Sequence, residues 1–248
     1  KSCKNFVNNL SDQVKTRDKY IDSWIDWHKN TKRKHPDFVD IMLSDNTDDK
    51  LTTDEIRSII WDTMAGGIDT SALSFEWLIY IFTNYPEVQH KIHQELDNII
   101  GPDRLPNLDD LENLKYINAT ICELFRMKHF APFGIPHHNL TDIKLGGYNI
   151  PKDTQIIYNL YALHMDPTLW DEPEKFCPER FMPGGSAHDL MENYLETDRI
   201  RTKYSKYGDR LFQFLPFGFG ILISTVIYCL DLNFLKNTQL IKNQLNIP

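Results

Sequence analysis

The pattern of hydrophobic and polar positions predicts that the first half of the chain is mostly α-helix. Apolar residues recur at helical spacing through residues 1–43, with a break at Pro36. A polar loop, Asp45–Lys50, follows. Pro86 opens another helix that is expected to end at Gly101, because Pro favours the first turn of a helix and Gly the position after its end. A further helix is expected from Leu108 to about His129.

Between these segments lies a long apolar run with a clear start. Thr52-Thr-Asp-Glu55 is a capping-box sequence, and the run continues to about Thr83. Its apolar residues surround the helix axis and do not form a single stripe. Such a helix is expected to be largely buried, and we predict that it passes through the centre of the domain.

After this helical half the period changes. Ile143–Ile150 predicts a hairpin that turns on Gly146-Gly147, and Gln155–Leu160 predicts another strand. Residues 164–186 are irregular, with Pro183-Gly-Gly-Ser186 as a flexible loop, and 187–212 are expected to form a polar, exposed insertion. The fold class is therefore mainly α with a small β region.

Composition narrows the classes of function. The chain has 248 residues, 41% of them hydrophobic, which is enough for one domain or a large part of one. Its net charge of -8 argues against a nucleic-acid partner. The four cysteines, at 3, 122, 177 and 229, are far apart and form no C-x-x-C pair, so a cysteine zinc site has no support and a disulfide framework has little. Reduced thiols in a cytosol-facing protein agree best with this spacing.

Two glycines interrupt the long apolar helix. Gly66 and Gly67 each cost about 1 kcal/mol against Ala in a helix, and Asp69 and Thr70 follow within one turn. A helix accepts such residues where a partner must approach its backbone closely. The alternative is tight helix packing, with the Thr70 hydroxyl bonded back to the preceding turn.

An acid and a base lie one helical turn apart at Glu123 and Arg126. The spacing alone says little, since Glu196 and Arg199 share it in the polar insertion. The helix around Glu123 also carries apolar residues, which indicates that this pair is partly buried. Pro-Glu-Arg-Phe follows at 178–181 and adds Arg180.

A longer stretch gives these short patterns a context. Tyr148–Thr154 and His164–Phe181 resemble the cytochrome P-450 haem-thiolate monooxygenases without gaps. The likeness spans about residues 38–220, with its signatures in family order, and is of the microsomal, eukaryotic type. It implies a partial cytochrome P-450 fold that corresponds to the C-terminal half of the family's domain.

The resemblance implies roles for the residues above. Asp69 and Thr70 match the acid and the alcohol beside the oxygen-binding groove, and Gly66 and Gly67 line that groove. His137 matches a haem-propionate contact, although a surface histidine pair with His138 remains the alternative. The family's buried charge network, which locks the loop beneath the haem, corresponds to Glu123, Arg126 and Arg180.

The chain carries the residues that lead into the family's cysteine loop, but the loop itself does not match the pattern. Its lead-in is Phe214–Gly220, where Phe217 and Gly220 match the pattern. The next pattern positions carry Leu222 for the propionate-binding Arg and Ser224 for the ligand Cys. Cys229 is the nearest thiol, and a buried small apolar side chain is its more ordinary role.

After Gly220 the likeness ends, which divides the chain into a partial haem-monooxygenase domain, 1–220, and an unrelated tail, 221–248. A splice or sequence alternative accounts better for so clean a break than a truncated relative does. By resemblance the function is that of a haem-dependent monooxygenase, with O2, a lipophilic small molecule and a flavoprotein reductase as partners. The resemblance implies that the parent protein sits on the cytosolic face of the endoplasmic reticulum membrane, and no anchor is expected within these residues. The alternatives are a non-catalytic relative that does not bind haem productively and, less favoured, a helical scaffold unrelated to haem.

Overall fold

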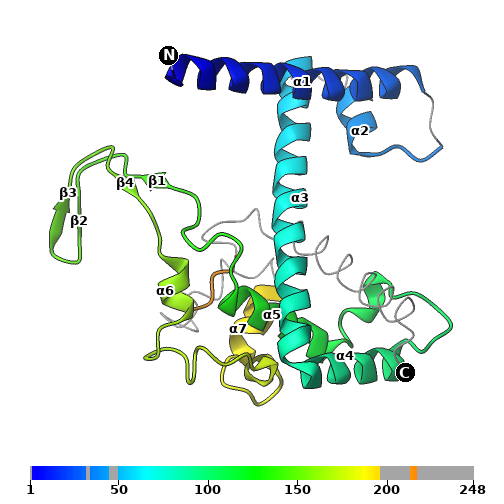
Figure 1. Cartoon of the computed structure of the whole chain (residues 1–248), viewed down its shortest axis with the longest axis vertical. Coiled ribbons are helices and arrows are strands. Elements are labelled where there is room, and N and C mark those ends of the chain that lie inside the picture. The colour runs from blue at the N-terminus through cyan, green and yellow to red at the C-terminus, as the bar shows by residue number, and fades with distance from the viewer. Residues whose placement is uncertain (1, 32–33, 45–49, 196–212, 217–248) are drawn as a thin grey trace. The chain divides into compact units, whose positions relative to one another are not determined.

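A computed structural model describes residues 2–31, 34–44, 50–195 and 213–216 (Figure 1). The chain divides into two compact units, residues 1–69 and 70–248. The helices and strands are α1 (Ser2–Asn30), α2 (Phe38–Ser44), α3 (Thr53–Asn84), α4 (Pro86–Ile99), α5 (Lys115–Met127), β1 (His137–His138), β2 (Ile143–Leu145), β3 (Tyr148–Ile150), β4 (Gln155–Ile156), α6 (Leu160–His164) and α7 (His188–Leu195), with two short 3-10 helices, η1 (Leu108–Asp110) and η2 (Pro178–Phe181). The mainly helical fold class with a small β region is confirmed.

The first unit consists of α1, α2 and the beginning of α3. Its core joins the three helices through six buried apolar side chains, Ile21, Ile25, Val39, Met42, Ile56 and Ile60. The predicted capping box is present, because the Thr52 backbone N–H donates to Glu55 Oε2 at 2.7 Å and the Glu55 N–H donates to Thr52 Oγ1 at 3.3 Å. The sequence therefore located the start of α3 correctly.

The second unit packs the end of α3 against α4 and α5. Its core contains Leu78 and Ile81 from α3 and a one-sided stripe from α4, Val88, Ile92 and Leu96. The helix predicted over 108–129 is shorter, since α5 begins only at Lys115. The Asp110 carboxylate accepts hydrogen bonds from both terminal nitrogens of the Arg104 guanidinium and from the Asn107 N–H. These bonds hold residues 104–110, which precede α5, in a turn.

The β region consists of two small antiparallel pairs. β2 and β3 form the predicted hairpin, with Leu145 opposite Tyr148. β1 pairs with β4, His138 opposite Gln155. The strand expected over 155–160 ends early because α6 begins at Leu160, where the Asn159 side chain accepts the Ala162 N–H at 2.9 Å.

The middle of α3 is not buried, contrary to the prediction for this helix. Trp61, Met64 and Ile68 are 42%, 41% and 56% exposed. An apolar pattern shows which residues can be buried, but burial also requires a neighbouring element. The core of the first unit reaches α3 at Ile56 and Ile60, and the core of the second reaches it again at Leu78, so the stretch between is left uncovered by these two cores.

The segment after η2 is tightly folded. A Cβ placed on Gly185 would lie 2.2 Å from the Glu179 carbonyl oxygen and 2.4 Å from that of Arg180. Only glycine therefore fits at this position without a shift of the backbone. Leu190 and Met191 of α7 are buried. The expectation of an exposed insertion from 187 is therefore wrong for 187–191, whereas a loop is present at 183–186 and its flexibility stays a prediction.

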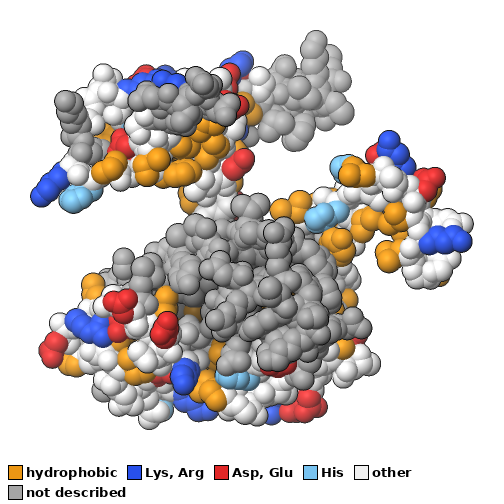
Figure 2. All heavy atoms as spheres, turned by 180° about the vertical axis from the view of Figure 1, so that it is seen from behind, with side chains coloured by type: hydrophobic (Ala, Val, Ile, Leu, Met, Phe, Trp, Pro, Cys, Tyr) orange, Lys and Arg blue, Asp and Glu red, His pale blue; other side chains and the backbone are white. Residues whose placement is uncertain are grey.

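Apolar side chains reach the surface in both units (Figure 2). Trp24 and Trp27 of α1 are 42% and 49% exposed, and Ile135 and Tyr148 in the β region are 79% and 77% exposed. Among the described helices, none combines the length and the hydropathy that a membrane span requires.

Candidate functional site

A buried ion pair lies on α5 in the second unit. Glu123 and Arg126 are both fully buried. The Arg126 guanidinium binds the Glu123 carboxylate in a bidentate manner. Nε donates to Oε2 at 2.7 Å, and Nη2 donates to Oε1 at 2.8 Å. Two parallel charge-assisted hydrogen bonds fix the relative orientation of the two side chains as well as their distance.

The other donors of Arg126 fasten α5 to a distant part of the chain. Nη1 donates to the His164 carbonyl at 2.8 Å, and Nη2 donates to the Pro173 carbonyl at 2.8 Å. The guanidinium also lies over the Trp170 ring, 5.3 Å from its centroid. These partners offset the desolvation of the cation, which would otherwise be costly.

Arg180 of η2 approaches the same carboxylate, as the family resemblance implies. Its Nε lies 3.4 Å from Glu123 Oε1, and its Nη2 donates to the Glu172 carbonyl at 2.8 Å. The Cys177 backbone N–H donates to Glu123 Oε1 at 2.9 Å. One buried carboxylate thus holds two guanidinium groups and a backbone amide, which ties α5 to the segment before α7. The other pair of the same spacing, Glu196 and Arg199, lies outside the described residues.

Glu95 is a residue that sequence reasoning missed. No side chain of α5 itself caps its N-terminus at Leu114. Instead, Glu95 of α4 accepts the Tyr116 N–H at 2.8 Å and the Ile117 N–H at 2.9 Å, one with each carboxylate oxygen. A negative group at a helix N-terminus is favourable. No local pattern marks this cap, because Glu95 is far from α5 in the sequence.

Replacing Glu95 by alanine should lower the free energy of unfolding by about 1–2 kcal/mol, since two helix N–H groups lose their acceptor. Urea denaturation followed by far-UV circular dichroism measures this. Asn98→Ala, at an exposed position of the same helix, is the matched control and should change stability by less than about 0.5 kcal/mol. Equal losses in the two variants would show that the cap does not stabilise α5.

Two buried histidines lie near the lead-in to the cysteine loop, and one of them, His164, binds it. His164 Nε2 accepts the Leu215 backbone N–H at 3.1 Å, and His129 Nδ1 accepts the Ala131 N–H at 2.9 Å. Burial, together with His129 and Arg126, lowers the pKa of His164 to about 3. Burial also lowers the pKa of His129, although the backbone of Pro216, Leu215 and Ala131 acts in the opposite direction. Both rings are therefore neutral near pH 7.

Phe214 anchors the same lead-in to the core. It is 6% exposed and packs against Phe181 and Trp170, with ring centroids 5.0 and 6.4 Å away. The lead-in is therefore held at Phe214 by packing and at Leu215 by a hydrogen bond. Phe217, Gly220, Leu222, Ser224 and Cys229 lie outside the described residues.

The residues that match the oxygen-binding groove lie on α3. Gly66, Gly67 and Asp69 are exposed in the first unit, and a Cβ added at either glycine would meet no atom within 4 Å. Thr70, half-buried, begins the second unit, and its carbonyl accepts the Ser74 hydroxyl at 2.8 Å. The functional roles of these residues remain predictions.

His137, the expected propionate contact, is exposed in β1. Its ring meets the Tyr158 ring edge-on, with centroids 5.1 Å apart. The neighbouring His138 is exposed as well. Both the propionate contact and the surface pair remain compatible with this position.

The described thiols do not fit a haem-thiolate ligand. Cys122 is 1% exposed and packs among apolar core residues such as Trp170 and Phe181. The Cys177 thiol donates to Glu179 Oε2 at 3.5 Å, and burial and the Glu179 carboxylate raise its pKa. A haem-thiolate ligand must be deprotonated and face the iron. Neither cysteine meets this condition, so no chemical step can be derived through a haem from the described residues.

Comparison with known proteins assigns this chain to a family. The family model for cytochrome P450 matches residues 3–221. This chain belongs to the cytochrome P450 family. The match extends further toward the N-terminus than residue 38, where the motifs of the sequence first become clear.

Curated cytochromes P450 from plants and fish are similar to this chain. Cytochrome P450 81F4 of Arabidopsis thaliana is 36% identical over 74% of this chain and 38% of its own length. Cytochrome P450 1A1 of Oncorhynchus mykiss is 38% identical over 65% of this chain and 30% of its own. Steroid 17-alpha-hydroxylase/17,20 lyase of Squalus acanthias is 40% identical over 58% of this chain and 29% of its own. The chain thus spans well under half the length of these relatives.

A solved structure agrees with the sequence relatives. A zebra fish cytochrome P450 with progesterone superposes with a TM-score of 0.73 at 27% identity, covering 94% of this chain and 52% of its own. This chain therefore has the fold of part of a cytochrome P450 domain.

Proposed function

We propose that the parent protein is a haem-dependent monooxygenase that inserts one oxygen atom of O2 into a lipophilic small molecule. Membership of the cytochrome P450 family supports this reaction class. The retained charge network of Glu123, Arg126 and Arg180 supports it as well, because the family uses such a network to lock the loop beneath the haem. In the parent, Asp69 and Thr70 would deliver protons, and Gly66, Gly67 and His137 would contact the cofactor.

The other partners of the parent follow from the same proposal. A flavoprotein reductase would supply electrons, and the endoplasmic reticulum membrane, at its cytosolic face, would be the location. The similar proteins carry names as different as a steroid hydroxylase and a phenylalanine N-monooxygenase. We therefore propose a lipophilic small molecule as the class of substrate and no individual compound.

For this chain itself we propose that it keeps part of the monooxygenase fold but does not bind haem productively and does not catalyse the reaction. The single observation that carries this is the combination of an anchored lead-in at Phe214 and Leu215 with Ser224 at the ligand position. A neutral serine hydroxyl supplies none of the electron donation that a thiolate gives to iron. In this proposal residues 1–220 form the partial monooxygenase domain and 221–248 an unrelated tail.

The test is haem titration followed by the absorption spectrum of the reduced, carbon-monoxide-bound protein. The chain should give no strongly red-shifted Soret band of a thiolate-ligated haem, and Cys229→Ser should give the same result. Ser224→Cys alone should not restore the band, because Leu222 still replaces the propionate-binding Arg. A thiolate-type band that disappears in Cys229→Ser would contradict the proposal and make Cys229 the ligand.

The transcript sequence after the codon for Gly220 tests the origin of the tail. An in-frame alternative that continues with Arg and Cys at the pattern positions would support a parent monooxygenase from which this chain differs by its C-terminal segment. A transcript without such an alternative would favour a relative that lost the ligand.

A further inference from the structure

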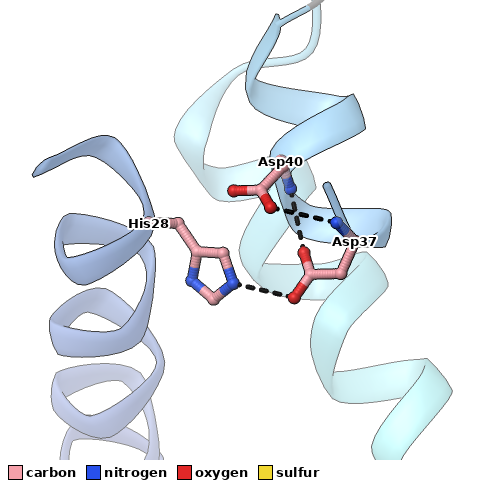
Figure 3. Close-up of side chains that lie close together, drawn as sticks. All are labelled: His28, Asp37 and Asp40. Carbon is pink, nitrogen blue, oxygen red and sulfur yellow. Dashed lines mark hydrogen bonds and ion pairs between the residues drawn. The ribbon is translucent and has the colours of Figure 1, made fainter. Parts of the chain in front are cut away.

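Three side chains with metal-binding atoms converge in the first unit, away from the residues of the monooxygenase pattern. His28 comes from α1, Asp37 directly precedes α2, and Asp40 lies in its first turn (Figure 3). One ligand atom of each residue lies within 4.8 Å of those of the other two. A sequence separation of nine residues between His28 and Asp37 matches no common metal motif, so the pattern alone did not reveal the cluster.

The orientation of His28 determines which of its nitrogens faces the carboxylates. Nδ1 lies 2.8 Å from the Trp24 carbonyl oxygen, which can only accept a hydrogen bond, so Nδ1 carries a hydrogen. In the neutral ring the lone pair is then on Nε2. That atom lies 3.0 Å from Asp37 Oδ2, which is also an acceptor. Two acceptors at this distance require a cation between them, either a proton or a metal ion.

The carboxylates are held in place by the backbone of α2. Asp37 Oδ1 accepts the Val39 N–H at 3.0 Å and the Asp40 N–H at 3.1 Å, and Asp40 Oδ2 accepts the Asp37 N–H at 3.0 Å. In these bonds Asp37 uses its Oδ1 and its backbone N–H, and its Oδ2 faces His28. The donor set is therefore oriented in advance, which is what distinguishes a binding site from a chance group of polar side chains.

The degree of burial also suits a small ion. The His28 side chain is fully buried, whereas the Asp37 side chain is 37% exposed. The more exposed part of the group is therefore the Asp37 carboxylate, where solvent could supply a remaining ligand. The imidazole closes the inner side.

We propose that His28, Asp37 and Asp40 form a binding site for one divalent transition-metal ion of the zinc type. In tetrahedral zinc sites the ligand atoms lie about 2.0–2.2 Å from the ion and so about 3.3 Å from one another. The 3.0 Å between His28 Nε2 and Asp37 Oδ2 is close to that separation, and the Asp40 oxygen, within 4.8 Å of both, would move closer on binding. The hydrogen bond from Nδ1 to a backbone carbonyl is the usual support of a metal-ligating histidine.

The donor set selects among cations. An imidazole nitrogen with two carboxylate oxygens suits Zn²⁺ or Co²⁺, whereas Mg²⁺ and Ca²⁺ favour oxygen donors alone. The bound ion would connect α1 to α2, because its ligands come from both sides of the segment that joins them. Its expected effect is to stabilise the first unit.

The test is titration of the purified chain with Co²⁺ under reducing conditions, followed by visible absorption, and competition by Zn²⁺. One Co²⁺ per chain should bind with the bands of a nitrogen- and oxygen-ligated ion and without the intense near-ultraviolet bands of a thiolate ligand. Zn²⁺ should displace it and raise the melting temperature of the chain. Mg²⁺ in the same range should do neither.

Two variants assign the site. Asp40→Asn keeps an amide oxygen that can still accept the Asp37 N–H, so α2 remains capped, and His28→Gln removes the nitrogen ligand. Each should weaken Co²⁺ binding at least about tenfold. His90→Gln and Asp26→Asn change exposed residues of the same types and should bind as the unaltered chain does.

Circular dichroism of Asp40→Asn without metal verifies that the variant is folded. Absence of Co²⁺ binding by the unaltered chain would overturn the proposal, because a proton or a cationic side chain would then neutralise the group. Binding that persists in folded Asp40→Asn and in His28→Gln would also overturn it, as would thiolate bands.

Discussion

Replacing Glu123 by alanine should lower the free energy of unfolding by about 3–5 kcal/mol, the cost of leaving buried cations without their counter-charge. Arg126 is fully buried and Arg180 is 8% exposed, and both lose the carboxylate that they share. The Cys177 N–H loses its acceptor as well. Denaturant unfolding and the yield of soluble protein would measure the loss.

Controls separate the charge from the hydrogen bonds. Glu123→Gln keeps one acceptor oxygen and should be destabilised less than Glu123→Ala. Glu174→Ala, at an exposed position of the neighbouring segment, should change stability by less than about 0.5 kcal/mol. Glu196→Ala should likewise cost little if that E-x-x-R pair is exposed as the sequence predicts. A loss at Glu123 no larger than at Glu174 would refute the network as a stabilising feature.

Acidification should destabilise the second unit through His129 and His164. In the unfolded chain each histidine has a pKa near 6.5, whereas burial lowers the pKa of both in the folded state, for His164 to about 3. Below pH 6.5 the unfolded state therefore binds more protons than the folded state. For His164, stability is lost as the pH falls from about 6.5 toward 3, at up to about 1.4 kcal/mol per pH unit, and His129 adds a loss that begins below about pH 6.5.

The double variant His129→Asn/His164→Gln isolates this effect. An Asn oxygen can replace Nδ1 of His129 as acceptor for Ala131, and a Gln oxygen can replace Nε2 of His164 as acceptor for Leu215. Free energies of unfolding at pH 7.5 and pH 5 should differ less in the double variant than in the unaltered chain. His90→Gln, at an exposed position, should leave the pH dependence unchanged. The same pH dependence in the double variant would show that these histidines do not titrate with unfolding.

Local signals in the sequence determined several features correctly. The Thr52–Glu55 capping box fixed the start of α3, and Gly146-Gly147 fixed the hairpin of β2 and β3. Each depends on residues a few positions apart, so their physics is local. The Glu123–Arg126 pair was indicated by its spacing together with the apolar residues around it, and the family motifs placed Arg180 beside it.

The tertiary structure alone decided features that join distant segments. Glu95 caps α5 from another helix, and His164 holds Leu215 across a long separation. Asp37 lies within 3.0 Å of His28 because α1 and α2 pack on a common core. No pattern along the chain encodes these pairs, because they depend on which surfaces meet in three dimensions.

The contrast is clearest within α3. Its sequence determined that it is a helix, where it begins, and that apolar residues such as Met64 and Ile68 lie all around its axis. Whether they are buried depends on a neighbouring surface, and in this chain they remain 41% and 56% exposed. Helix formation follows from hydrogen bonds within one segment, whereas burial follows from contact between segments, so only the first can be read from the sequence.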